Sequence, residues 1–73
     1  MLKPGKYRHY KGKDYEVIGA AKLESTLEDM VVYKPLYEIE HKLWVRPLAV
    51  FTENLEIEGK IVSRYEYIGE VEP

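Results

Sequence analysis

The stretch Leu43-Trp44-Val45-Arg46-Pro47, followed four residues later by Phe51, decides the fold that the sequence predicts. It holds the only Trp and the only Phe of the chain. Arg46 precedes a proline, and steric clash with the proline ring keeps such a residue extended. We therefore predict a strand over residues 43–46 that ends at Pro47, because proline lacks the N–H group that a central ladder requires.

Side chains of this strand alternate between two faces. Leu43 and Val45 share one face, which we expect to be the core side, and Trp44 and Arg46 share the other, which we expect to be only partly covered.

The segment after Pro47 is too short for a stable helix and favours a single 3₁₀ turn. Such a turn would bring Leu48 and Phe51 back over the open end of the apolar core.

Other short strands precede and follow this stretch at a spacing of roughly ten residues, with turn residues between them, which is typical of an all-β barrel or sandwich. Gly12 is expected at positive φ in a tight turn, and Gly19 inside a strand suggests a bulge. We predict a small SH3-like barrel of five or six short antiparallel strands, with an OB-type barrel as the alternative. The expected strands cover residues 6–10, 14–21, 30–36, 43–46, 55–58 and 61–68.

The length of 73 residues predicts a single domain over 1–73, with its core in 4–68 and an acidic tail at 69–73. A core this small gives only modest stability, which weak association between copies of the chain would increase. Since the chain has no Cys, disulfides and Cys-based zinc sites are excluded. No apolar run suits a membrane span or a secretory signal, so we expect no membrane partner and a cytoplasmic location.

Charge is unevenly distributed along the chain, although the net charge is only −2. Residues 1–13 carry five cations and no acid, whereas the part from Glu53 onward carries six Glu against Lys60 and Arg64. Either the two ends neutralise each other across neighbouring strands, or the first segment forms an anion-facing basic patch. The overall acidity counts against general nucleic-acid binding, which depends on many phosphate contacts.

Several ordered motifs resemble DUF1653, a family of small bacterial proteins of unknown function. The resemblance covers residues 4–68 and implies an SH3-like barrel and a bacterial source, but no activity. The residues that carry it are Pro4-Gly5-x-Tyr7-Arg8-His9-Tyr10-Lys11-Gly12-x-x-Tyr15-x-Val17, Val32-Tyr33-x-x-Leu36-Tyr37, Leu43-Trp44-Val45-Arg46-Pro47-x-x-x-Phe51-x-Glu53, and Gly59 with Arg64-Tyr65 and Ile68.

The chain departs from the family pattern in two loops. It reads Leu23-Glu24-Ser25-Thr26 where such proteins usually read His-Ser-Glu-Thr, and the turn between Tyr37 and Trp44 lacks the usual Gly. Any role of that family His therefore does not transfer to this chain.

Residues for catalysis, metal binding or cofactor binding do not form a recognisable pattern. His9 and His41 are the only imidazoles and have no ligand spacing, and Ser25 and Ser63 lie in ordinary polar contexts. There is no glycine-rich phosphate loop, GxSxG or HExxH motif. We predict no metal, no cofactor and no catalytic residue, and an enzyme is the least favoured class.

A set of aromatic and arginine residues is the better candidate for a site, because Trp, Tyr and Arg are enriched at binding hot spots. The alternative is structural: Trp44 plugs one end of the barrel, with Arg46 paired to Glu53 or stacked on Tyr10. The predicted partner-binding residues are Arg8, Tyr10, Tyr37, Trp44 and Arg46.

These residues favour a non-catalytic binding module, an SH3-like barrel whose partner is a protein or a peptide. The alternative function is binding of an anionic small molecule or of single-stranded nucleic acid, with bases stacked on Tyr and Trp.

Overall fold

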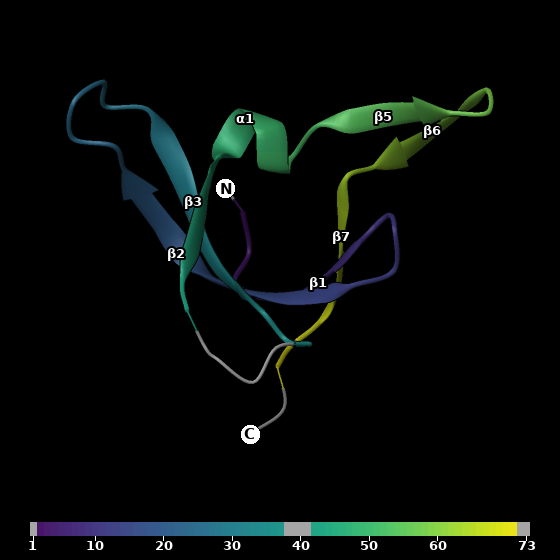
Figure 1. Ribbon diagram of the computed structural model, residues 1–73, viewed down its shortest axis with the longest axis horizontal. Helices are drawn as coiled ribbons and strands as arrows, with labels where there is room; N and C mark the ends of the chain where they lie inside the picture. The colour runs from purple at the N-terminus through teal and green to yellow at the C-terminus, as the bar shows by residue number, and fades with distance from the viewer. Residues whose placement is uncertain (1, 38–41, 72–73) are drawn as a thin grey trace.

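The computed structural model describes residues 2–37 and 42–71, and strands form most of this part of the chain (Figure 1). The predicted all-β class is confirmed. One helical turn, α1 (Leu48–Phe51), interrupts the strands. The strands are β1 (Gly5–His9), β2 (Asp14–Lys22), β3 (Asp29–Pro35), β4 (Trp44–Pro47), β5 (Asn54–Ile57), β6 (Lys60–Ser63) and β7 (Tyr65–Gly69).

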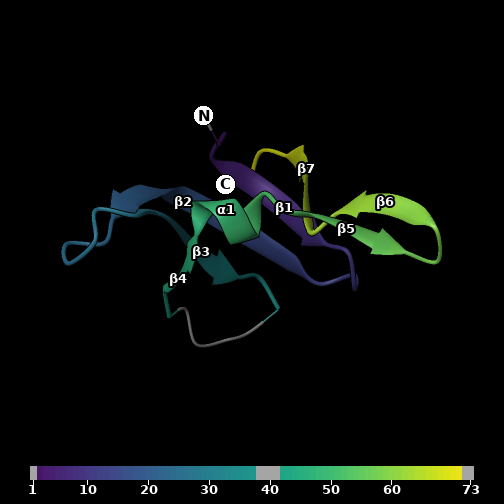
Figure 2. The same ribbon diagram turned by 90° about the horizontal axis from the view of Figure 1, so that it is seen from above.

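Five strands form one antiparallel sheet in the order β4-β3-β2-β1-β7, and β5 pairs with β6 in a separate hairpin. The sheet curls strongly, with α1 over its open side, and the hairpin projects away from it (Figures 1 and 2). Because β4 and β7 are the two edges of the sheet, the described strands form an open curled sheet and not a closed barrel.

The curl of the sheet follows in part from the predicted bulge in β2. The register between β2 and β3 shifts between Val17 and Gly19. A bulge bends a strand and increases its twist, which lets the long β2 curve between its two neighbours. This prediction from Gly19 is confirmed.

Two tight turns use positive φ where the sequence provides glycine. Gly12 has φ 102°, as predicted, and its N–H donates to the His9 carbonyl at 2.7 Å. In the β5–β6 hairpin, Glu58 (φ 49°) and Gly59 (φ 81°) are the two central residues. Positive φ at both is typical of a type I′ turn, whose twist matches that of the paired strands.

The prediction of one strand over 61–68 is wrong. This segment forms β6 and β7, which belong to different sheets, so the described residues form seven strands and not five or six. The break falls at Arg64, whose N–H donates to the Glu53 carbonyl and whose Nη2 lies 2.9 Å from Glu53 Oε2. These contacts hold Arg64 beside Glu53, the residue that precedes β5.

The predicted 3₁₀ turn after Pro47 is an α-helical turn instead. The Thr52 N–H donates to the Leu48 carbonyl four residues back at 3.0 Å, and the Thr52 hydroxyl donates to the same oxygen at 2.8 Å. These two hydrogen bonds favour the α-helical turn over the tighter 3₁₀ turn. Its predicted packing is confirmed, because Phe51 is buried and Leu48 packs against the core.

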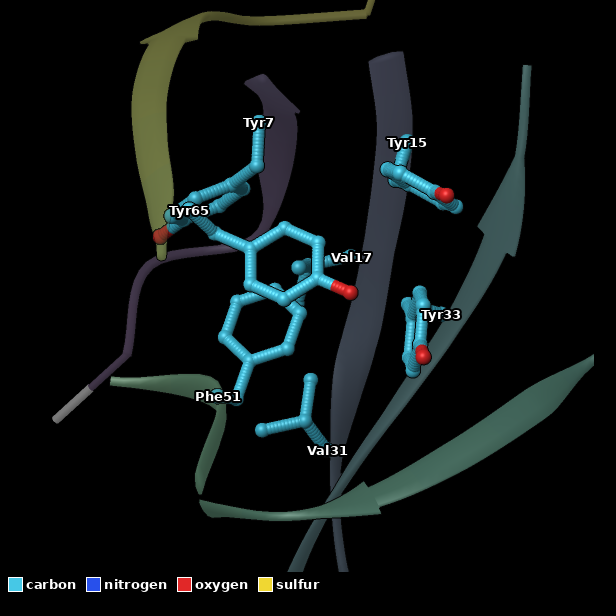
Figure 3. Packing of buried hydrophobic residues seen from close by; sticks show 7 residues of the cluster. All are labelled: Tyr7, Tyr15, Val17, Val31, Tyr33, Phe51 and Tyr65. Atoms are coloured by element: carbon cyan, nitrogen blue, oxygen red, sulfur yellow. The ribbon is translucent and has the colours of Figure 1, made fainter. Parts of the chain in front are cut away.

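The core is unusually rich in tyrosine (Figure 3). Phe51 stacks on Tyr65 with ring centroids 4.0 Å apart and meets Tyr7 and Tyr33 edge-on at 5.6 and 5.4 Å. Such pairs contribute about 0.5–1.5 kcal/mol each beyond the area they bury. The buried cluster consists of Tyr7, Tyr15, Val17, Val31, Tyr33, Phe51 and Tyr65.

The predicted orientation of β4 is reversed. Leu43 and Val45 are 60% and 61% exposed, whereas Trp44 faces the aromatic core. Trp44 pairs with Tyr33 across the β3–β4 ladder, and directly opposite residues point to the same face of a sheet. Because Tyr33 is buried, this register turns Trp44 and Arg46 inward.

Some predictions lie wholly or partly outside the described residues. These include His41, most of the turn between Tyr37 and Trp44, and the last two residues of the predicted acidic tail. Within the described part, Gly69 belongs to β7 and not to a tail.

Replacing Phe51 by Ala should destabilise the protein strongly, because it leaves a cavity among the buried tyrosine rings. We expect the free energy of unfolding to fall by about 3–5 kcal/mol, measured by urea denaturation. The matched control is Ile61→Ala, since Ile61 is 70% exposed, and its effect should stay within about 0.5 kcal/mol. Equal effects of the two changes would contradict the described core.

Candidate functional site

Three of the five predicted site residues lie together on the inner side of the curled sheet. The Trp44 ring lies 6.1 Å from that of Tyr15 and 6.0 Å from that of Tyr33. Tyr37 meets Tyr15 edge-on at 5.5 Å, and their hydroxyl oxygens are 3.1 Å apart. We call Tyr15, Tyr33, Tyr37, Trp44 and Tyr65 the aromatic cluster.

Arg46 lies against this cluster and is half-buried. Its Nε–H donates to the Tyr33 hydroxyl at 3.3 Å, and its Cζ lies 5.8 Å from the centre of the Tyr65 ring. The expected pairing with Glu53 or stacking on Tyr10 is therefore wrong, and Arg64 takes Glu53 instead. No carboxylate of the described residues forms an ion pair with Arg46.

Burial raises the pKa of two hydroxyls of the cluster, those of Tyr15 and Tyr65. Desolvation, followed by a hydrogen bond with Tyr37, raises the pKa of Tyr15, and desolvation also raises the pKa of Tyr65. The hydrogen bond with the Tyr33 hydroxyl raises the pKa of Arg46 above its usual range. The arrangement is thus an arginine cation that is hydrogen-bonded to the hydroxyl of one tyrosine and lies beside the ring of another.

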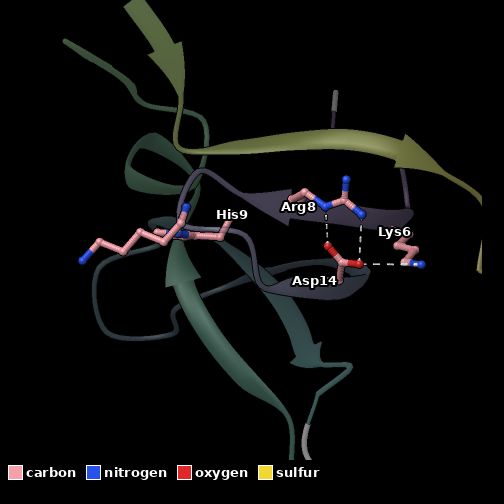
Figure 4. Close-up of polar contacts among 5 residues, drawn as sticks. Lys6, Arg8, His9 and Asp14 are labelled. Carbon is pink, nitrogen blue, oxygen red and sulfur yellow. Dashed lines mark hydrogen bonds and ion pairs between the residues drawn. The ribbon is translucent and has the colours of Figure 1, made fainter. Parts of the chain in front are cut away.

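Arg8 does not join the aromatic cluster. It alternates with the inward-facing Tyr7 and His9 of β1, so its side chain points away from the core. Its Nε lies 2.9 Å from Asp14 Oδ1, and Lys6 Nζ lies 3.7 Å from Asp14 Oδ2 (Figure 4). The Arg8 guanidinium thus already has a carboxylate partner.

Tyr10 shares a surface hollow of about 440 Å³ with Arg8. Its ring also lies 4.5 Å from that of His9, which connects it to the core side. The residues that line the hollow are Arg8, His9, Tyr10, Gly12, Val62, Ser63 and Glu66.

Among the described residues, no ion pair joins the basic segment 1–13 to the acidic part from Glu53 onward. β1 pairs with β7, and Arg8 lies opposite Glu66, but the ion pairs of Lys6 and Arg8 within the described residues are with Asp14. Lys11 and Lys13 lie instead over tyrosine rings, 5.9 Å from the centre of Tyr10 and 4.8 Å from the centre of Tyr37. Lys13 therefore lies directly at the aromatic cluster, and Lys11 lies over Tyr10 outside it.

His9 belongs to the site although the sequence did not single it out. Its ring meets Tyr65 at 4.9 Å and Tyr15 at 6.4 Å, and its Nδ1 accepts the Lys11 N–H at 3.1 Å. The signal was its alternation with Tyr7 in β1, which predicts that both share one face. Desolvation, followed by the charges of Arg64, Arg46 and Lys11, lowers the pKa of His9.

Among residues 2–37 and 42–71, no group of three or more His, Asp or Glu side chains is placed to hold a metal ion. In the same ranges, no helix has the length and apolarity needed to cross a membrane.

The fold and the aromatic cluster define a small all-β protein with a tyrosine-rich core. A family model described as "Protein of unknown function (DUF1653)" matches residues 5–67, so the chain belongs to this family, as its motifs predicted. The chain is similar to a protein of this family from Bordetella bronchiseptica with a solved crystal structure. The two share 36% identity and a TM-score of 0.86 over 99% of this chain and 94% of that one. No curated protein matches the chain.

Acidification should destabilise the fold through His9. The pKa of His9 is lowered in the folded state, so the unfolded chain binds a proton more readily. Stability should be fully retained above the ordinary pKa of 6.5 and should fall as the pH drops from there toward the lower folded value. We expect a lower melting temperature at about pH 5 than at about pH 7.5.

The matched control for this pH dependence is His9→Gln, which keeps an acceptor for the Lys11 N–H. Its melting temperature should change less over the same range, because the titrating group is gone. Asp14, whose pKa is lowered by its hydrogen bond with Arg8, titrates below its ordinary 3.8 and so outside this window. An unchanged pH dependence in His9→Gln would refute the assignment to His9.

Proposed function

We propose that this protein is a non-catalytic binding module that engages a peptide segment of a protein partner through Trp44, Tyr37 and Arg46. The observation that carries the proposal is the combination of exposure and rigidity at these residues. Trp44 and Tyr37 are 37% and 43% exposed, although both rings pack on buried Tyr15. Large rings held in place lose little entropy on binding, which is one reason why they dominate hot spots.

Arg46 supports the same proposal. It is half-buried beside the exposed rings, and a guanidinium next to aromatic side chains can use both hydrogen bonds and stacking toward a partner. The one hydrogen bond that the Arg46 side chain makes within the described residues uses Nε, which leaves the Nη groups for other contacts. Tyr10 lies at the edge of this surface beside His9, whereas Arg8 is outside it.

The second candidate is an anionic small molecule or single-stranded nucleic acid. The observation that favours it is the placement of Lys11 and Lys13 over Tyr10 and Tyr37. Lysines beside aromatic rings are one way of holding phosphates and bases together. We also propose that the protein is bacterial and acts in the cytoplasm, as expected from the sequence.

The proposal predicts that Trp44 and Arg46 can be replaced without loss of the fold. Trp44→Ala should lower the free energy of unfolding by about 1–2 kcal/mol, since the ring lies on an edge strand and is partly exposed. Arg46→Met should cost at most about 1 kcal/mol, because it keeps the length of the side chain but loses one hydrogen bond. Urea denaturation measures both, and unfolding of both variants would make the pair structural and remove the proposed surface.

Binding itself can be tested by selecting peptides from a random display library with the purified protein. The matched control is Val45→Ser, which lies on the same strand but points to the opposite, exposed face. Peptides should be retained by the wild type and by Val45→Ser, and should be lost with Trp44→Ala. Retention by all three proteins, or selection of no peptide, would contradict the proposal.

A further inference from the structure

We infer that the partner segment is acidic and that one of its carboxylates pairs with the guanidinium of Arg46. This inference rests on the proposed binding function and specifies the chemistry of the partner. It is carried by the placement of the cations around the aromatic cluster.

Arg46 offers the geometry that a carboxylate requires. A guanidinium has five N–H donors, and within the described residues only the Nε–H has a hydrogen-bond partner, the Tyr33 hydroxyl. The free Nη groups can donate to both oxygens of one carboxylate, which is the strong bidentate arrangement. Because Arg46 is half-buried beside aromatic rings, such a pair would be less screened by solvent than an ordinary surface pair.

The charges near His9, whose ring meets Tyr15 and Tyr65 of the aromatic cluster, are positive. Arg46, Arg64 and Lys11 are close enough to His9 to lower its pKa. Of these three cations, only Arg64 has a carboxylate partner in the described part of the chain, namely Glu53. Lys13 lies over the ring of Tyr37, which meets Tyr15 edge-on, and adds a further positive charge. The surface is therefore complementary to an anion.

An acidic peptide fits this surface better than a nucleic acid does. Arg46, Lys11 and Lys13, which have no carboxylate partner among residues 2–37 and 42–71, suit one or two carboxylates, whereas single-stranded nucleic acid needs a charged groove that follows many phosphates. Most ring pairs of the aromatic cluster meet edge-on, and Tyr15 and Tyr33 are buried, so few ring faces remain for stacked bases.

The experiment uses the intrinsic fluorescence of Trp44, which is the only Trp of the chain and lies in the proposed site. Three probes are titrated separately: a peptide in which Glu alternates with Leu, the same peptide with Gln in place of Glu, and an oligothymidine of similar length. The Glu peptide should bind about tenfold or more tightly than the Gln peptide, and added salt should weaken its binding.

Variants locate the carboxylate pair. Arg46→Gln should weaken binding of the Glu peptide about tenfold or more, while Arg46→Lys should recover only part of the affinity because Lys cannot pair in the bidentate way. The matched control for lost charge is Lys60→Gln at the tip of the projecting β5–β6 hairpin, which should keep the wild-type affinity (Figure 1). As a second readout, the pKa of His9 measured by NMR should rise when the Glu peptide is bound.

The outcomes separate this inference from the proposed function. Equal binding of the Glu and Gln peptides would overturn the acidic partner but leave the peptide-binding module in place. Binding of oligothymidine alone would overturn both and favour the nucleic-acid candidate. Failure of all three probes would overturn the acidic partner, and the library selection described above would then decide separately whether the surface binds peptides at all.

Discussion

The stack of Phe51 on Tyr65 is the contact on which the rest of the structure depends. The two rings are nearly parallel, at 4°, with centroids 4.0 Å apart. They join α1, which follows the edge strand β4, to β7 at the opposite edge of the sheet. In the part of the chain that the structure describes, no second sheet covers this open sheet, so its stability depends on such a contact between its edges. The curl of the sheet and the ring stack therefore support each other.

A core built from tyrosine imposes a second constraint, since each ring brings a hydroxyl that needs a hydrogen-bond partner when buried. The Tyr7 hydroxyl donates to the Lys3 carbonyl at 2.6 Å. The hydroxyls of Tyr15 and Tyr33 bond to Tyr37 and Arg46 respectively. The hydrogen bonds that give the buried Tyr15 and Tyr33 hydroxyls a partner thus also hold Tyr37 and Arg46 in place at the surface. The proposed binding surface is therefore a consequence of a core built from tyrosine.

Local sequence was sufficient to predict much of the fold. Most strands, the positive φ of Gly12, the bulge at Gly19 and the end of the β4 strand at Pro47 follow from properties of single residues or of their neighbours. The face of β4 could not be predicted in this way, because it depends on the pairing of Trp44 with Tyr33, eleven positions earlier in the chain. The break at Arg64 is set by Glu53, which is also distant in sequence.

The candidate site shows the same difference between what residue type predicts and what contacts between distant residues decide. Tyr37, Trp44 and Arg46 were predicted from residue type and do lie together, although the partners of Arg46 were wrong because Glu53 is taken by Arg64. Arg8 was included because it is an arginine next to aromatic residues, but Asp14 on the neighbouring strand holds it on the other face. His9 was missed as a site residue because only the folded chain shows the cations that surround it.

The central claim is that a core phenol, and not a carboxylate, holds Arg46 in place. A double-mutant cycle of Tyr33→Phe and Arg46→Met in the free energy of unfolding measures this contact most directly. We expect a coupling free energy of about 1 kcal/mol, typical of one hydrogen bond that is partly exposed. Strictly additive effects of the two changes would contradict the account.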